Sequence, residues 1–259
     1  MMQVVVFLDL DDTIFQTVGK CPTDEPLYAA AVDRMGKPLS FISESQKRFL
    51  DWISKDAIVI PTTARNFDSF RRVNLSFHHA AILSFGAVIL SPHGRLDEEW
   101  DEGIRSQLNR RRADLESIER QTSDKLKQQS SDLRVRLVHD FEMPVYLVAK
   151  DPGGDGTKLE LLRDIWHPFV EQGEYFLHWN DNNLSLVPAF LGKEKAVSYV
   201  LTRYFKGLSI LTIGAGDSLT DRPFLAQCQF VVMPRKSQLF QSVLLERPRC
   251  SAEAMPPMT

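Results

Sequence analysis

The chain opens with an apolar run that stops at a group of acids: residues 4–13 read VVVFLDLDDT. The β-branched run Val4–Leu8 is typical of a strand that is buried on both faces, as in the middle of a parallel sheet. Alternation along the extended chain then places the carboxylates of Asp9 and Asp11 on one side. Two carboxylates so close together repel each other, so they need a cation or a shared proton. Magnesium fits, because it binds one or two carboxylates together with water and phosphate oxygens.

Two later strand patterns also end in polar residues. Residues 57–65 read AIVIPTTAR and residues 208–217 read LSILTIGAGD, which makes Asp217 the natural third acid. Amphipathic helical patterns at about 193–205 and 221–226 stand between strands. Buried strands that alternate with such helices favour an α/β fold with a doubly wound parallel sheet. In this fold ligands bind beyond the carboxyl ends of the strands.

Residues 96–186 have a different pattern from the rest of the chain. A charged helix with apolar residues at helical spacing precedes two strand patterns, and a second helix precedes a hairpin pattern. This double helix-strand-strand order predicts an α+β domain inserted into the first one. We therefore expect a discontinuous core domain at 1–95 and 187–246, an α+β cap domain at 96–186, and a flexible tail at 247–259.

The overall composition excludes several classes of protein. Hydrophobic residues make up 43% and charged residues 25% of the 259 residues, which is typical of globular domains and argues against disorder. The net charge of −3 gives no support to nucleic-acid or membrane-surface binding, and no apolar run approaches the roughly 20 residues that cross a bilayer. Three widely spaced cysteines and an N-terminus without a secretory pattern favour a cytoplasmic protein.

Four short motifs carry a resemblance to a known family. They are DLDDT at 9–13, TAR at 63–65, Lys193 at the start of a helix, and GDSLTD at 216–221. In order and context they resemble the four signatures of the haloacid dehalogenase-like (HAD) phosphohydrolases, which implies a Rossmann-like core. The inserted segment lies where the subfamily with a large α/β cap carries it. Its helix-strand-strand doublet is similar to caps of the Cof-type group that includes sucrose-phosphate and mannosyl-phosphate phosphatases.

The resemblance implies a mechanism and assigns residues to it. Asp9 would attack phosphorus and become an aspartyl-phosphate, while Asp11 would act first as general acid and then as general base. Thr63 and Lys193 would screen the negative charge on the transferred phosphoryl group. Mg²⁺ is the implied cofactor, and its implied ligands are Asp9, Asp11 through its backbone carbonyl, Asp217 and, in or just behind the metal shell, Asp221.

The sequence departs from the family pattern in three places. Ala64 replaces a glycine, and Leu219-Thr220 replaces the usual Gly-Asn. The distance from the first motif to the second is also long. A turn pattern at 34–37 within the extra segment 16–42 predicts a β-hairpin that forms either a flap over the site or an interface. Outside the motif acids, the candidates for substrate contact are Arg65, Lys150, His178 and Asn182.

We therefore expect a magnesium-dependent phosphatase that hydrolyses a small phosphorylated metabolite, with a sugar phosphate as one candidate. Two alternatives stay open. A phosphomutase would transfer the phosphoryl group within a sugar phosphate, and a signalling domain would accept it without turnover. A general acid at Asp11 beside the acceptor favours turnover over a lasting phosphoryl mark. Neither the substrate nor the oligomeric state follows from the sequence.

Overall fold

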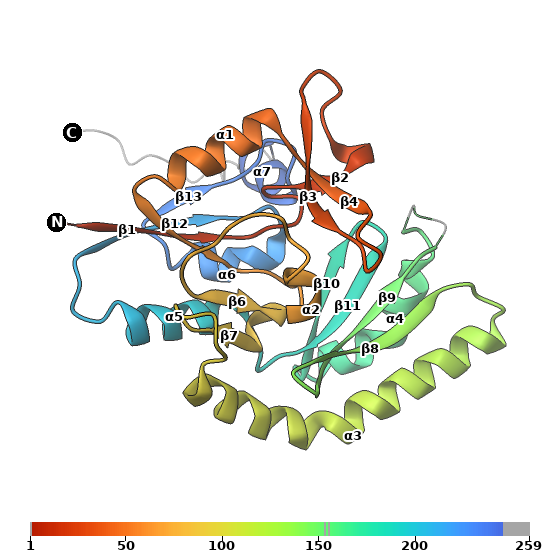
Figure 1. The fold of residues 1–259 in the computed structure, drawn as a ribbon. Helices are drawn as coiled ribbons and strands as arrows, with labels where there is room; N and C mark the ends of the chain where they lie inside the picture. Colours follow the sequence, from red (N-terminus) through yellow and green to blue (C-terminus); the bar gives the residue numbers. More distant parts are fainter. Residues whose placement is uncertain (1, 153, 155, 246–259) are drawn as a thin grey trace, which may run out of the picture.

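A four-stranded parallel sheet forms the centre of the core (Figure 1). The structure is a computed structural model that describes residues 2–152, 154 and 156–245, so the tail expected at 247–259 lies outside the described residues. All neighbouring strands run parallel, which confirms the doubly wound sheet predicted from the sequence. In sheet order the strands are β13 (Phe230–Val232), β12 (Ile210–Ala215), β1 (Gln3–Leu8) and β5 (Ala57–Pro61).

Helices cover both faces of this sheet: α1 (Glu44–Ile53) lies on one face, and α5 (Lys193–Tyr204) and α6 (Arg222–Leu225) lie on the other (Figure 1). The apolar run of β1 explains this arrangement, because alternate side chains of a strand point to opposite faces. Val5 and Phe7 pack into the cluster that holds α5 and α6, whereas Val6 and Leu8 pack into the cluster that holds α1. A strand apolar on both faces is therefore the centre of a three-layer core.

A short hairpin extends the core beyond β5. Thr62 pairs in parallel with Ile82 in β6 (Ala81–Leu83), and the chain then turns through η2 (Ser84–Gly86) into β7 (Val88–Leu90). Gly86 has a φ of +90°, and a Cβ there would lie 2.4 Å from the carbonyl oxygen of Gly192. Only glycine fits at this close approach, where the chain leaves the core and later returns to it. The remaining short elements of the core are α2 (Phe67–Phe70), η3 (Leu219–Asp221), α7 (Gln238–Phe240) and η4 (Gln241–Leu245).

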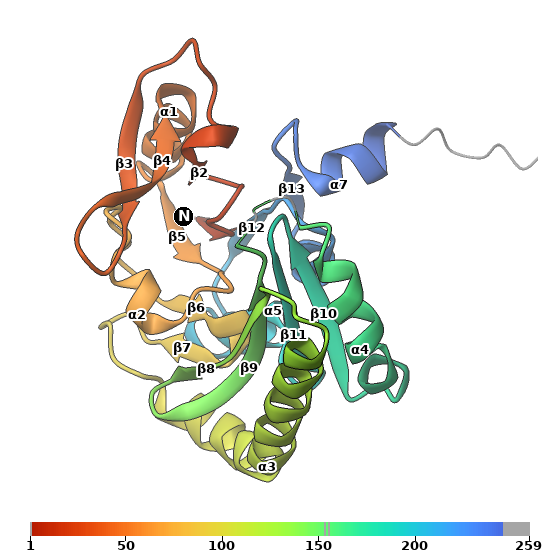
Figure 2. The ribbon, with the colours of Figure 1, turned by 90° about the vertical axis from the view of Figure 1, so that its right-hand side faces the viewer.

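The inserted part is an antiparallel sheet with two helices on one face (Figure 2). Its elements are α3 (Glu98–Gln128), β8 (Arg134–Asp140), β9 (Met143–Lys150), α4 (Leu159–Glu171), β10 (Tyr175–Asn180) and β11 (Asn183–Pro188). The sheet order is β10-β11-β9-β8, and Trp166 of α4 is fully buried between the helices and the sheet. The predicted order of two helix-strand-strand units is confirmed. The limits placed at residues 95 and 187 stay predictions.

The extra segment between the first two motifs forms a small antiparallel sheet, which we call the flap. It consists of β2 (Gln16–Thr17), η1 (Val18–Lys20), β3 (Leu27–Val32) and β4 (Pro38–Ser43). The turn between β3 and β4 is closed by the Asp33 carboxylate, which accepts the backbone N–H groups of Met35 and Lys37. Figure 2 shows the flap standing on the core beside the inserted sheet.

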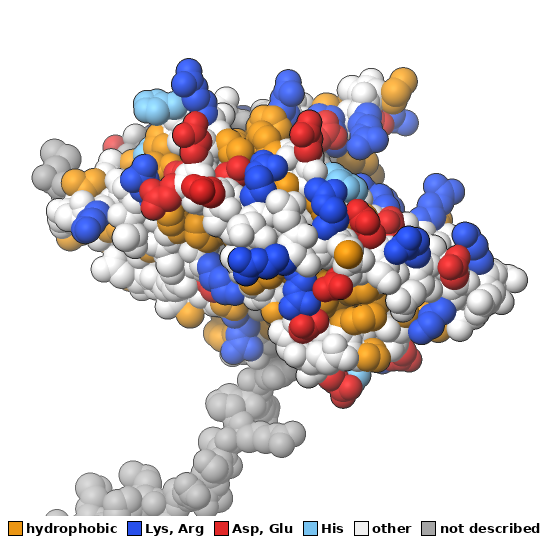
Figure 3. Space-filling view, turned by 90° about the horizontal axis from the view of Figure 1, so that it is seen from below, with side chains coloured by type: hydrophobic (Ala, Val, Ile, Leu, Met, Phe, Trp, Pro, Cys, Tyr) orange, Lys and Arg blue, Asp and Glu red, His pale blue; other side chains and the backbone are white. Residues whose placement is uncertain are grey.

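The outer face of α3 is covered by charges of both signs. Figure 3 shows Lys and Arg side chains interspersed with Asp and Glu on the side of the molecule where α3 lies. Arg105 pairs with Asp101, and Arg111 pairs with Asp114, one turn away along the helix. Such exposed pairs each contribute little to stability and keep the surface solvated. Within the described ranges, no helix is both long and apolar enough to cross a bilayer.

Candidate active site

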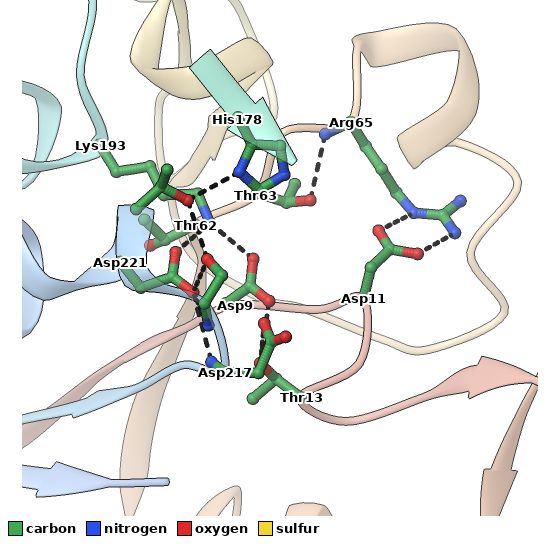
Figure 4. Close-up of polar contacts among 12 residues, drawn as sticks. Asp9, Asp11, Thr13, Thr62, Thr63, Arg65, His178, Lys193, Asp217 and Asp221 are labelled. Atoms are coloured by element: carbon green, nitrogen blue, oxygen red, sulfur yellow. Dashed lines mark hydrogen bonds and ion pairs between the residues drawn. The ribbon is translucent and has the colours of Figure 1, made fainter. Parts of the chain in front are cut away.

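Three neighbouring strands and one helix bring the sequence motifs together (Figure 4). Asp9 directly follows β1, Asp217 lies two residues beyond β12, and Thr63 lies two residues beyond β5. Lys193 is the first residue of α5. Because the carboxyl ends of neighbouring parallel strands meet at one edge of a sheet, these four side chains line a single cavity.

A buried ammonium group joins two of the acids. The Nζ atom of Lys193 lies 2.6 Å from Oδ1 of Asp9 and 2.6 Å from Oδ1 of Asp221, and all three residues are buried. Burial alone would lower the pKa of Lys193, but the carboxylates of Asp221 and Asp9 outweigh it and hold this pKa above its usual range. Lys193 is therefore a fixed positive charge beside Asp9.

Asp9, Asp217 and Asp221 form a cluster that fits a hard divalent cation. One carboxylate oxygen from each residue lies within 4.8 Å of the others. Burial raises the pKa of Asp217 to about 9, and the charges of Asp9 and Asp221 add to the shift. Burial also raises the pKa of Asp9 to about 7, although Lys193 opposes this shift. The raised pKa values mean that one ammonium group does not balance three ionised carboxylates, so the cluster needs protons or a cation, and carboxylate oxygens are ligands that Mg²⁺ prefers.

Asp11 is held by Arg65. The guanidinium Nε and Nη2 atoms of Arg65 each donate to one carboxylate oxygen of Asp11, both at 2.7 Å. Arg65 also lies over the ring of Phe15, with its Cζ 5.0 Å from the ring centroid, and its backbone N–H donates to Oγ1 of Thr63 at 3.1 Å. A bidentate arginine fixes the plane of a carboxylate. The sequence marked Arg65 for substrate contact, and the structure shows it beside the cavity with Asp11 as its partner.

Hydroxyl groups surround the buried acids. The hydroxyl of Thr13 lies 2.9 Å from Oδ2 of Asp9 and 3.3 Å from Oδ1 of Asp217. The backbone N–H and the hydroxyl of Ser218 donate to Oδ2 of Asp221 at 3.0 and 2.8 Å. Asp221 therefore accepts from Ser218 with one carboxylate oxygen and pairs with Lys193 through the other. These bonds, together with Lys193, hold the pKa of Asp221 below its usual value against the effect of burial.

The inserted sheet reaches the core acids through His178 on β10. Its Nδ1 lies 2.8 Å from the hydroxyl oxygen of Thr220, one of the three residues that depart from the family pattern. The ring also meets the ring of Phe85 edge-on, with centroids 5.1 Å apart. Burial, with the charge of Lys193 adding to it, lowers the pKa of His178 to about 4. His178 is therefore neutral at physiological pH.

The flap is tied to both neighbours by one lysine. The Nζ atom of Lys20 lies 2.7 Å from Oδ2 of Asp12, and it also pairs with the carboxylate of Asp181 in the β10–β11 turn. Flap, core and inserted sheet thus meet at a single ammonium group. The contact between Lys20 and Asp181 could not be predicted, because these two residues lie 161 positions apart along the chain.

The cavity between these parts has a volume of about 390 Å³. A larger hollow of about 580 Å³ lies between α1, β5 and residues 74–79, but Asp9 and Asp217 line only the smaller one. Among the predicted substrate contacts, Arg65, His178 and Asn182 line the cavity, whereas Lys150 is exposed and does not belong to its lining. The lining also includes residues that were not predicted from the sequence, among them Lys20, Phe85, Arg136 and Tyr146.

Known structures share the fold of this chain. The chain aligns with a sucrose-phosphatase from Synechocystis, whose structure holds sucrose and phosphate, at a TM-score of 0.55 and 17% identity over 92% of this chain and 85% of that one. The chain has the haloacid dehalogenase-like fold. A haloacid dehalogenase-like hydrolase from B. subtilis (TM-score 0.52, 16% identity) is covered over 93% of both chains. The C-terminal domain of a C. albicans trehalose-6-phosphate phosphatase aligns with a TM-score of 0.51 and 14% identity. The alignment covers 86% of this chain and 72% of that domain's chain.

Sequence comparison alone does not find these relationships. No protein-family model matches the chain, and no curated protein matches it. The structural likeness confirms the HAD fold with an inserted cap that the four motifs predicted. From here on we call the inserted sheet with its two helices the cap.

Proposed function

We propose that the protein is a magnesium-dependent phosphatase that hydrolyses a small phosphate ester through an aspartyl-phosphate on Asp9. The observation that carries this proposal is the meeting of Asp9, Thr63, Lys193 and Asp217 at one cavity. A carboxylate nucleophile, a fixed cation, a hydroxyl donor and a cation-binding acid are the groups that phosphoryl transfer from a monoester requires.

The first step transfers the phosphoryl group to the protein. A carboxylate oxygen of Asp9 forms a bond to phosphorus while the bond from phosphorus to the leaving oxygen breaks. Asp11, as general acid, delivers a proton to the leaving alkoxide. In the second step Asp11 takes a proton from a water molecule whose oxygen attacks phosphorus, which releases inorganic phosphate and restores Asp9. Both oxygens of Asp11 accept from Arg65 in the structure, so Asp11 must leave this ion pair when it carries the proton.

The remaining groups screen the charge of the phosphoryl oxygens. Lys193 keeps its positive charge beside Asp9, so it offsets the repulsion between the nucleophile and an anionic ester. Oγ1 of Thr63 already accepts the N–H of Arg65, so the hydroxyl proton is free to bind a phosphoryl oxygen. Asp9, Asp217, Asp221 and the backbone carbonyl of Asp11 would hold Mg²⁺, which when bound adds positive charge next to the same oxygens.

The cavity supports a sugar phosphate as substrate. The cap contributes several amide and hydroxyl groups to the wall that faces the acids, and such groups suit a leaving group rich in hydroxyls. Two of the similar structures are a sucrose-phosphatase and a trehalose-6-phosphate phosphatase, so the same fold serves sugar phosphates elsewhere. The cap residues concerned are Asn180, Asn182, Asn183 and Ser185.

A panel of phosphate esters tests the proposal. We expect release of inorganic phosphate in the presence of Mg²⁺, loss of release in EDTA, and loss of at least 100-fold in Asp9→Asn. Asp164→Asn is the matched control, since Asp164 is an exposed acid of α4, and it should keep full activity. Undiminished hydrolysis by Asp9→Asn would remove the nucleophile from the mechanism. A phosphorylated sugar isomer formed without free phosphate would indicate a phosphomutase, and a lasting phosphoryl-protein a signalling domain.

A further inference from the structure

The cap sheet presents an ordered row of side chains to the cavity. Arg136 on β8 pairs with Val148 on β9, Val148 with Ser185 on β11, and Ser185 with His178 on β10. Residues paired in this way across a sheet point to the same face. His178, Ser185 and Arg136 all line the cavity, so this face of the cap is its roof.

The roof carries a group of basic residues at its β8–β9 edge. Arg134 pairs directly with Lys150 across the two strands, and Arg136 is two residues further along β8 on the same face. Like charges placed directly opposite each other in a sheet are destabilising. We call Arg134, Arg136 and Lys150 the edge cluster. All three side chains are exposed, so solvent screens part of their repulsion, and a bound anion would relieve the rest.

The cations near the acids already have partners, whereas the described part of the chain shows no acidic partner for the edge cluster. Lys193 pairs with Asp9 and Asp221, Arg65 with Asp11, and Lys20 with Asp12 and Asp181. Among the described residues, no carboxylate lies within salt-bridge distance of any member of the edge cluster. Arg136 is therefore a cavity cation whose charge is available to a ligand.

The edge cluster lies away from the acids that would receive the scissile phosphate. His178, which contacts Thr220 on the core, is three strands from Arg136 along the row, or about 14 Å at the usual strand spacing. Figure 2 shows β8 and β9 on the side of the cap sheet that faces α2, and β10 on the opposite side. A ligand with one anion at the acid cluster would thus need a second anion at its far end to reach Arg136.

We propose that the edge cluster binds a second acidic group of the substrate, so that the preferred substrate carries a phosphate ester at one end and a carboxylate or second phosphate at the other. This inference rests on the proposed phosphatase function and narrows its substrate class. Guanidinium groups suit both anions, because their N–H groups match two oxygens of a carboxylate or phosphate. Arg136 binds the distal anion, and Arg134 and Lys150 strengthen the field around it.

Matched pairs of substrates test the edge cluster. Fructose 1,6-bisphosphate is compared with fructose 6-phosphate, and 6-phosphogluconate with glucitol 6-phosphate, because each pair differs in one acidic group at the end of a six-carbon chain far from the phosphate ester. The readout is the ratio of kcat/KM within each pair, measured for the full chain with Mg²⁺. In at least one pair we expect kcat/KM to be about tenfold or more higher for the doubly acidic member. The reason is that a hydrogen bond to a charged group contributes a binding energy of this size. Arg136→Gln should bring that ratio close to one, and Arg110→Gln, an exposed arginine of α3, should leave it unchanged.

A binding measurement separates this inference from the proposed function. Calorimetry with the Asp9→Asn protein and Mg²⁺ gives the affinity for each member of a pair without turnover. The inference requires tighter binding of the doubly acidic member and the loss of that preference when Arg136→Gln is added. Equal affinities, or a preference that survives Arg136→Gln, would overturn the inference even if hydrolysis proceeds. Failure to hydrolyse any ester would overturn the phosphatase function, while the affinity ratio would still decide the role of the edge cluster.

Discussion

Replacing Lys193 with methionine removes the only ammonium group that contacts the buried acids Asp9 and Asp221 in the described structure. Methionine keeps much of the length of the side chain and can still pack on Phe224, over whose ring the Nζ atom now lies. Three carboxylates whose oxygens lie within 4.8 Å of one another would then face one another without a protein cation. Removal of one partner of a buried ion pair costs about 3–5 kcal/mol. Because Asp9 and Asp217 can take up protons to relieve the repulsion, we expect a loss near 3 kcal/mol.

Urea unfolding in EDTA and in Mg²⁺ measures this loss. In EDTA the free energy of unfolding of Lys193→Met should fall well below that of the wild type. In Mg²⁺ the difference should narrow, because the more negative cluster binds the cation more tightly and a ligand bound only to the folded state stabilises it. Lys195→Met is the matched control, since Lys195 is an exposed lysine of α5, and it should cost less than about 1 kcal/mol. A Lys193→Met protein as stable as this control in EDTA would refute the reasoning.

Two further changes test the backbone and the buried imidazole. Gly86→Ala should destabilise the protein by more than about 1 kcal/mol in urea, because its φ is +90° and the new Cβ would meet the carbonyl of Gly192. Gly103→Ala, in open space on α3, should instead be neutral or stabilising. His178 has its pKa lowered from 6.5 to about 4, so between these pH values the unfolded chain binds a proton that the folded chain does not. Stability should therefore decrease as the pH is lowered from 6.5 to 4, by at most about 3 kcal/mol, and His178→Gln should remove that component; a slope that persists in His178→Gln would contradict the assignment.

Much of the core could be predicted because its determinants are local. The run Val4–Leu8 is apolar on both faces, so only a central strand of a layered sheet can bury it. The acids after this strand, the threonine at position 63 and the lysine at position 193 each follow a recognisable change of pattern. Their meeting at one cavity follows from the rule that parallel strands end at the same edge.

The rest of the site depends on contacts that local pattern does not encode. His178 meets Thr220, and Lys20 meets Asp12 and Asp181, only because the cap and the flap dock on the core in one particular way. Nothing in the sequence around Arg65 shows that its partner is Asp11. The sequence also marked Lys150 for substrate contact, and the structure places it outside the cavity lining, although beside Arg134 on the roof of the cap.

Trapping of the phosphoryl-protein tests the central claim most directly. Asp11→Asn slows the second step, because the water then lacks its general base, whereas p-nitrophenyl phosphate has a leaving group that needs little help from an acid. After acid quenching in the presence of Mg²⁺, peptide mapping by mass spectrometry should find one phosphoryl group, on Asp9. Release of p-nitrophenol with Asp9 unmodified, or with the phosphoryl group on another residue, would contradict the account.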